Sequence, residues 1–244
     1  MAILITGGSK GIGLAIGLAF ARAEGAEVFI NYHANDDSAG EAARAVEQAG
    51  GKPCVVKGDV STPAGAQAIV DEVATHTDRL DQVVHCAVDP LAGPVLNLDP
   101  IRFTEAVKLN GIGLLYIVQA ALPLLGDGSS VFFLSSRGSN AVVSNYAALG
   151  TSKAFGESLI RYLAKELAPR GIRANTVSAG PLDTDAIRAV IPDAEARLAA
   201  AAAANPSGRG LAFDDVTETV LWLASPGAKM IQGRVVFVDG GLYL

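Results

Sequence analysis

The segment Thr6-Gly7-Gly8-Ser9-Lys10-Gly11-Ile12-Gly13 decides the expected fold of this 244-residue chain. It follows the short apolar run Ala2–Thr6 and opens the longer stretch Ile12–Glu24, which are the patterns of a strand and of a helix. Glycines at such a turn let the backbone approach a pyrophosphate whose charge faces the helix N-terminus. A tight connection with no ligand would also use glycine, so the remaining sequence must decide between the two.

Short apolar runs alternate with longer amphipathic stretches along the whole chain, as in a parallel sheet covered by helices on both faces. We expect seven strands, at Ala2–Thr6, Glu27–Tyr32, Lys52–Lys57, Gln82–Cys86, Ser130–Ser135, Arg173–Ser178 and Val235–Val238. We expect helices at Ile12–Glu24, Ser38–Ala49, Ala64–Thr75, Arg102–Leu125, Tyr146–Ala168 and Phe213–Leu223, and the alanine run 199–204 has strong helix propensity. No linker or repeat divides these segments. The sequence therefore predicts one doubly wound α/β Rossmann domain over residues 1–244.

The composition limits the class of protein and its partners. Half of the residues are hydrophobic and 18% are charged, which is typical of a compact globular chain. The formal charge of −6 and the lack of a basic tract argue against a nucleic-acid partner. Cys54 and Cys86 lie in apolar segments, so we expect reduced, buried cysteines and no metal site. We find no signal peptide or apolar segment of membrane-spanning length, and we expect a cytoplasmic protein without a membrane partner.

Further motifs resemble the short-chain dehydrogenase/reductase family, and they occur in the family's order over essentially the whole chain. Besides the Thr-Gly-x3-Gly-x-Gly loop, they are Gly58-Asp59-Val60, Leu109-Asn110, Ser135-Ser136, Ser178-Ala179-Gly180-Pro181 and the closing segment Gln232–Gly241. The resemblance implies a nicotinamide dinucleotide held by Gly7, Ser9, Lys10, Gly11, Ile12, Gly13, Asp59, Val60 and Pro181. It also implies a catalytic serine, which we assign to Ser135, and a structural role for Asn110. The order of Gly180-Pro181 reverses the family's Pro-Gly turn.

The end of the second expected strand bears on the choice of cofactor. An acidic residue there would bind the ribose 2′-hydroxyl of NAD and repel a 2′-phosphate. This chain has Asn31-Tyr32-His33 instead, and Lys10 in the glycine loop can pair with a phosphate. We therefore expect NADPH rather than NADH, with Asn31 and His33 near the cofactor.

Tyr146 stands seven residues before Lys153, and Leu149 occupies the position four before it. In ketone reduction the tyrosine donor must sit one bond from the carbon that receives hydride. In an α,β-unsaturated thioester the hydride reaches the β-carbon while charge collects on the thioester oxygen, so the stabilising group must be displaced. Tyr146 at Tyr-x6-Lys spacing meets that need, and on a helix it would face the site alongside Lys153. A core tyrosine and a surface lysine at helical spacing are the alternative.

The Tyr-x6-Lys pair resembles the enoyl-acyl-carrier-protein reductases of the short-chain family, and most of all their type III, NADPH-using members. That resemblance implies that Tyr146 hydrogen-bonds the enolate oxygen and that Lys153 holds the nicotinamide ribose. Ser136 stands where better-known members have a second tyrosine, so we assign it a supporting role. His85 lies inside an apolar strand, and we interpret it as a hydrogen-bonded structural histidine rather than a base.

The segment 182–211 lies where the family builds its substrate-covering helices. It mixes apolar residues with Arg188, Arg197 and Arg209, which suits an acyl chain on an anionic carrier, although the arginines also suit a solvated helix. We expect an enoyl thioester of acyl carrier protein or CoA as substrate. The alternatives are a carbonyl reductase of secondary metabolism using Ser135 and Tyr146, and a non-catalytic NADPH-binding regulator. Apolar stretches at 112–125 and 155–167 suggest paired helices, and the resemblance suggests a homotetramer.

Overall fold

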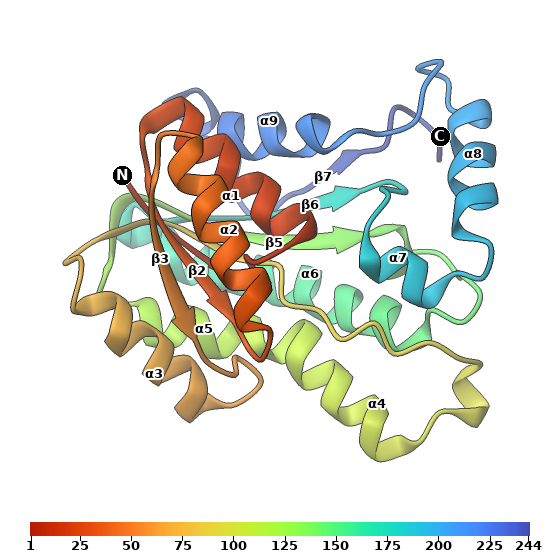
Figure 1. Ribbon diagram of the computed structural model, residues 1–244, viewed down its shortest axis with the longest axis horizontal. Helices are drawn as coiled ribbons and strands as arrows, with labels where there is room; N and C mark the ends of the chain where they lie inside the picture. The colour runs from red at the N-terminus through yellow and green to blue at the C-terminus, as the bar shows by residue number, and fades with distance from the viewer.

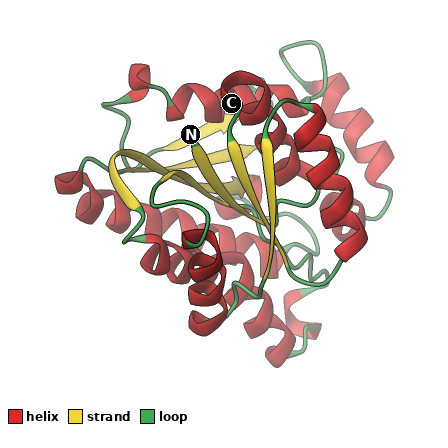
Figure 2. Cartoon of the chain, turned by 60° about the vertical axis from the view of Figure 1, so that its left-hand side comes forward, coloured by secondary structure: helices red, strands yellow, loops and turns green.

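The computed structural model describes residues 1–244 and contains one sheet of seven parallel strands. The strand order is β3-β2-β1-β4-β5-β6-β7. The strands are β1 (Ala2–Thr6), β2 (Glu27–Tyr32), β3 (Lys52–Lys57), β4 (Leu80–His85), β5 (Leu125–Ser136), β6 (Arg173–Ala179) and β7 (Val235–Val238). Figure 2 shows the sheet between helices on both sides. The predicted doubly wound α/β fold is confirmed.

The helices form two layers that the figures show on opposite faces of the sheet (Figure 1). One layer holds α1 (Gly11–Glu24), α2 (Asp36–Gln48) and α9 (Phe213–Ala224). The other holds α3 (Pro63–Ala74), α5 (Gly113–Ala121) and α6 (Ala147–Leu167), with α4 (Pro100–Val107) extending beyond the sheet. Side-chain caps begin several of these helices. For example, Asn35 accepts a hydrogen bond from Ser38 N, and Thr62 accepts one from Gly65 N.

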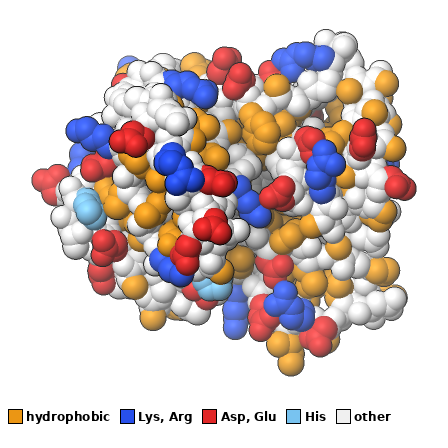
Figure 3. Space-filling view, in the orientation of Figure 1, with side chains coloured by type: hydrophobic (Ala, Val, Ile, Leu, Met, Phe, Trp, Pro, Cys, Tyr) orange, Lys and Arg blue, Asp and Glu red, His pale blue; other side chains and the backbone are white.

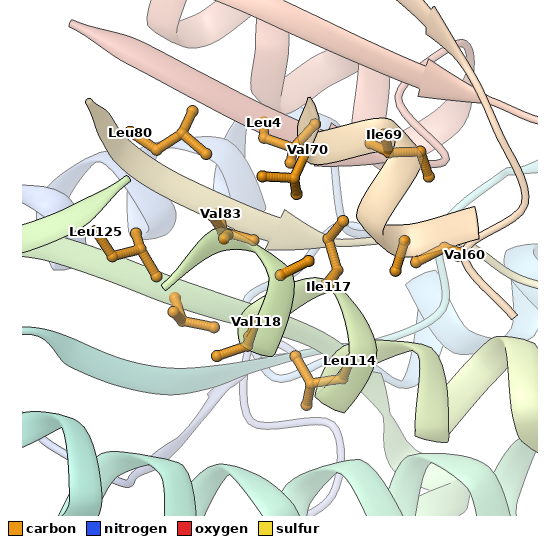
Figure 4. Packing of buried hydrophobic residues seen from close by; sticks show 14 of the residues in the cluster. Leu4, Val60, Ile69, Val70, Leu80, Val83, Leu114, Ile117, Val118 and Leu125 are labelled. Carbon is orange, nitrogen blue, oxygen red and sulfur yellow. The ribbon is translucent and has the colours of Figure 1, made fainter. Parts of the chain in front are cut away.

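The hydrophobic core is split by the sheet into two clusters, of 26 and 20 buried residues. The larger cluster packs side chains of β1 and β4 against α3 and α5, as Leu4, Val83, Ile69 and Leu114 show in Figure 4. The smaller one packs β1 and β2 against α1, α2 and α9. Each buried Leu, Ile or Val contributes about 1.5–3 kcal/mol to folding. Burial on both faces explains why the central strands are continuous apolar runs rather than alternating ones.

The single helix predicted for Arg102–Leu125 is wrong. The structure divides it into α4, a π-helical turn η2 (Lys108–Ile112) and α5, and α5 ends at Ala121. Pro123 explains the early end, because proline cannot donate the helical hydrogen bond and restricts the residue before it. At η2 the backbone runs close to α6: a Cβ on Gly111 would lie 3.0 Å from the Ser152 carbonyl oxygen. Because α5 ends at Ala121, the strand β5 can begin at Leu125, five residues before the predicted Ser130.

Other predicted boundaries hold to within one or two residues, and the alanine run lies in the helix α8 (Ala194–Ala204) as expected. A short helix α7 (Asp185–Val190) precedes it. Cys54 and Cys86 are both free, but they are partly rather than fully buried, which corrects the expectation for them. None of the helices combines the length and the apolar character that crossing a bilayer demands.

The order of strands places the site. Successive strands run outward in opposite directions from the pair β1 and β4, which is the point where ligands bind in doubly wound sheets. The carboxyl ends of β1, β4, β5 and β6 lie at one edge of the sheet. Figure 1 shows α7 and α8 on the side toward which β5 and β6 point. The glycine loop, the serines of β5 and the start of α6 are thus brought together.

Candidate active site

The glycine loop between β1 and α1 forms a close backbone turn. Gly7 has φ +65°, and a Cβ there would lie 2.8 Å from the Cα of Ala87 in the loop after β4. A Cβ on Gly13 would overlap the carbonyl oxygen of Gly7. The helix α1 begins after Lys10 without a side-chain cap, so its first backbone N–H groups remain available to an anion. The loop therefore fits a pyrophosphate, and it holds the predicted Ser9, Gly11 and Ile12.

Asn31, His33 and Lys10, which were also predicted to bind the cofactor, lie in three different environments. Asn31 is buried, and its amide donates to the carbonyl oxygens of Val56 and Gly58 at 3.1 Å each. The amide therefore ties β2 to the end of β3. His33 is exposed in the following loop. Lys10 forms an exposed ion pair with Asp185 of α7 at 3.2 Å.

Asp59 and Val60 follow β3, as predicted, but their side chains already have partners. The Asp59 carboxylate accepts hydrogen bonds from the Ser61 backbone N–H and hydroxyl, both at 2.9 Å. The Val60 side chain is buried in the larger core cluster. Any contact with an adenine would therefore come mainly from the backbone of this segment.

Tyr146 lies immediately before α6, at its N-cap, rather than inside the helix as predicted. The preceding residue, Asn145, has a left-handed backbone with φ +60°, which asparagine tolerates better than most residues. The Asn145 carbonyl also accepts from Gly93 N at 3.1 Å. Burial raises the pKa of Tyr146, so the phenol stays protonated and can donate. Leu149, four before Lys153, is buried in α6.

The two serines at the end of β5 point to different partners. The Ser136 hydroxyl lies 3.1 Å from the Tyr146 hydroxyl. The Ser135 hydroxyl donates instead to the Glu157 carboxylate of α6, at 2.5 Å. The geometry therefore corrects the assignment of Ser135 as the catalytic serine: Ser136, predicted as supporting, is the one beside the tyrosine, and Ser135 anchors the strand to α6.

Lys153 is 6% exposed on α6 and has no hydrogen-bond acceptor or carboxylate within bonding distance. Its ammonium lies 4.8 Å from the centroid of the Phe133 ring. Burial lowers the pKa of Lys153 to about 8, partly offset by Cys86 and Glu157. A buried ammonium with free N–H donors is costly unless a ligand accepts from it, which fits ribose hydroxyls at this place.

Buried hydrogen bonds through His85 connect β1, β4 and η2. His85 Nδ1 lies 2.8 Å from the Thr6 hydroxyl, and its Nε2 lies 3.1 Å from the Leu109 carbonyl oxygen. Burial lowers the pKa of His85 to about 3, so the ring is neutral, and the structural interpretation of this histidine is confirmed. Asn110, in η2, accepts from Asp89 N at 2.6 Å and donates to Asp89 O at 3.1 Å. Asn110 thus fixes the loop after β4.

A cavity of about 480 Å³ lies beside Pro181. It is enclosed mainly by α8 and the C-terminal segment, with Leu198, Leu211 and Leu242 among its apolar lining residues. Neither Tyr146 nor Lys153 lines this cavity, so it does not contain the pair of hydroxyls of Tyr146 and Ser136. Within the 182–211 segment, Arg188 forms an ion pair with Asp183, and Arg209 forms one with Asp215.

Sequence reasoning missed two residues of the site. Glu157 has a local signal, since it lies four residues after Lys153 and so on the same helix face. Arg137 has none, because its partner Tyr243 comes from the far end of the chain: the guanidinium lies 4.5 Å from that ring's centroid.

Comparison with known proteins agrees with the geometry. The family model described as enoyl-(acyl carrier protein) reductase matches residues 7–243. The chain is 35% identical to 1-cyclohexenylcarbonyl-CoA reductase of Streptomyces collinus, over 98% of this chain and 85% of the relative. It is 32% identical to the enoyl-(acyl-carrier-protein) reductase (NADH) FabI of Salmonella typhimurium, over 98% and 92%.

A solved structure extends the likeness to three dimensions. A dehydrogenase/reductase from Sinorhizobium meliloti 1021 superposes with a TM-score of 0.90 at 29% identity, covering 100% of this chain and 95% of that one. The two relatives described above are named as reductases of 1-cyclohexenylcarbonyl-CoA and of an enoyl-acyl-carrier-protein. The chain belongs to the short-chain dehydrogenase/reductase family, in its enoyl-(acyl-carrier-protein) reductase-like branch, and is an NAD(P)H-dependent oxidoreductase.

Proposed function

We propose that this protein uses NADPH to reduce the trans-2 double bond of an enoyl thioester. The observation that carries the proposal is the pair of hydroxyls of Tyr146 and Ser136, 3.1 Å apart, at the start of the helix α6 that also carries the buried and unpartnered Lys153. The position at which a carbonyl reductase would carry tyrosine is filled by Leu149, which is buried in α6 and has no polar group.

The chemistry follows from these groups. When bound, the cofactor would supply the hydride that adds to the β-carbon of the substrate, and the resulting enolate would take a proton from solvent at its α-carbon. Tyr146 donates a hydrogen bond to the thioester oxygen, where negative charge develops, and its raised pKa keeps the proton in place for this purpose. Ser136 orients the phenol through their hydrogen bond. Lys153 binds the nicotinamide ribose and thereby positions the cofactor over the substrate.

The preference for NADPH rests on two features. The end of β2 carries no acidic residue, since Asn31-Tyr32-His33 occupies it, and Lys10 supplies a cation in the glycine loop. The ion pair of Lys10 with Asp185 is exposed on both sides and is therefore easily exchanged for a phosphate. The relative FabI is named for NADH, so the preference needs its own test. Lys10→Met should raise the KM for NADPH several-fold and leave the KM for NADH unchanged.

For the acyl substrate we propose a thioester of acyl carrier protein or CoA, covered by the segment 182–211. The cavity beside Pro181 offers about 480 Å³ under α8 for part of the acyl chain. On the face shown in Figure 3, acidic and basic side chains are interspersed without a continuous basic area, which gives no support to a nucleic-acid partner. Assembly as a homo-oligomer is supported by exposed Phe155 and Tyr162 on α6.

The experiment follows NADPH oxidation with crotonyl-CoA, a longer trans-2-enoyl thioester, acetoacetyl-CoA and a simple ketone. Tyr146→Phe is expected to lower kcat for the enoyl substrates by about 100-fold or more, the cost of removing one preorganised donor. Tyr116→Phe is the matched control, because that partly buried tyrosine packs against the core from α5. Turnover of the ketones without enoyl turnover would refute the proposal and favour the carbonyl reductase. NADPH binding with no turnover would favour the regulator.

A further inference from the structure

Arg137 follows directly after Ser136 and lies at the edge of the hydroxyl pair. The segment wraps closely around the catalytic tyrosine: a Cβ on Gly138 would lie 2.5 Å from the Cδ1 of Tyr146. The Arg137 side chain is half-buried. It forms no ion pair and no hydrogen bond with the protein, although a guanidinium carries five N–H donors.

The C-terminal segment places the Tyr243 ring beside this guanidinium. The Tyr243 ring centroid lies 4.5 Å from the Arg137 Cζ, within the range of a cation–π contact. The guanidinium N–H groups have no acceptor in the protein and are therefore available to a ligand. Figure 1 shows the C-terminus beside α8, and Leu242 lines the cavity beside Pro181 together with Leu198 of α8.

The charges around Tyr243 favour an anion. Burial raises the pKa of the Tyr243 phenol, and the positive charges of Arg137 and of Arg197 in α8 act against that rise. Arg197 also has no carboxylate partner. The one acidic group that acts on Tyr243 is Asp239, whose carboxylate accepts from Gly241 N at 2.9 Å. Two guanidinium groups without a carboxylate partner thus act on Tyr243.

We propose that Arg137, beside the Tyr243 ring, binds an oxyanion of the thioester substrate. The oxyanion is a carboxylate on the acyl chain or the phosphate of the pantetheine arm, since a guanidinium edge binds either with two parallel hydrogen bonds. Arg137 would then be a specificity-determining residue. This inference rests on the proposed function, because it names the kind of thioester that the site selects.

The test measures binding without turnover, using saturated thioesters and the protein loaded with NADP. Butanoyl-pantetheine is neutral, butanoyl-phosphopantetheine adds the phosphate, and succinyl-pantetheine adds a carboxylate. Titration calorimetry is expected to show about tenfold tighter binding of at least one anionic ligand than of the neutral one, from a charge-assisted hydrogen bond in a half-exposed place. The ligand that gains identifies the source of the oxyanion.

The variants decide whether Arg137 is responsible. Arg137→Met is expected to remove the preference and to leave the affinity for the neutral ligand within twofold, while Arg137→Lys retains part of it. Tyr243→Phe should keep the preference and Tyr243→Leu should weaken it. Arg22→Met, at the exposed end of α1, removes the same charge far from the site and should change nothing.

Three outcomes would overturn the inference: no preference in the wild type, a preference that survives in Arg137→Met, or an equal loss of affinity for all three ligands. Failure of the enoyl reductase function looks different. In that case the Arg137-dependent preference is present in calorimetry, but no enoyl thioester oxidises NADPH.

Discussion

His85 should make the folded protein lose stability in mild acid by a predictable amount. Burial lowers the pKa of this ring from 6.5 to about 3, and both ring nitrogens are engaged, with Thr6 and with the Leu109 carbonyl. Between these two pKa values the unfolded chain binds a proton that the folded chain does not. Stability from this group is therefore full above pH 6.5 and is lost as the pH falls toward 3.

The size of the effect follows from the two pKa values. At pH 5 the unfolded state gains about 2 kcal/mol from protonation of His85, against about 0.2 kcal/mol at pH 7. Urea unfolding followed by circular dichroism at both pH values should thus show a fall in the wild type that is larger than the fall in His85→Gln by about 2 kcal/mol. Other carboxylates titrate in both proteins, so the difference isolates the histidine.

Two comparisons make this prediction refutable. Thr6→Val removes the partner hydroxyl but keeps the titrating ring, so it should lower the free energy of unfolding at pH 7 while the additional loss at pH 5 persists. Equal losses between pH 7 and pH 5 in the wild type and in His85→Gln would show that His85 is not a buried neutral group, and the argument for a support beneath the site would fall.

The remaining predictions concern the two serines and the glycine loop. Ser136→Ala should lower kcat for an enoyl thioester by about 2- to 10-fold, the value of one hydrogen bond, while Ser135→Ala should lower the melting temperature more than kcat. The opposite pattern would return the catalytic role to Ser135. Gly13→Ala should weaken NADPH binding, measured by fluorescence titration, by at least about tenfold, because its Cβ would overlap the Gly7 carbonyl oxygen. Wild-type affinity in that variant would show that the loop can relax.

The fold could be predicted because its signals are local. Strands such as Ala2–Thr6 and Glu27–Tyr32 are continuous apolar runs, and the structure reproduces both with the same ends. The helix predicted at Arg102–Leu125 failed where two local signals compete, since helical periodicity continues past Pro123. Proline decides the boundary there because its missing N–H outweighs the propensity of its neighbours.

The site was harder to predict because two adjacent serines look alike in sequence. Along a strand, neighbouring side chains point to opposite sides, so only one of Ser135 and Ser136 can face Tyr146. Which one does so depends on the partners: Glu157 accepts from the first, and the phenol lies beside the second. A sequence pattern gives the spacing between residues, but it does not show on which side of the strand the partner of each side chain lies.

Lys153 shows what the site costs the folded protein before a ligand binds. Its pKa is about 8 in the folded chain against an ordinary 10.5, so the folded state holds the proton more weakly than the unfolded state. Below pH 8 this group lowers stability, and that loss is relieved as the pH rises from 8 toward 10.5. The Phe133 ring offsets only part of the penalty, since no carboxylate is bonded to the ammonium. An apolar residue at this buried position would give a more stable folded protein. A ligand whose hydroxyls accept from this ammonium would relieve the penalty, which is what we propose for the cofactor ribose.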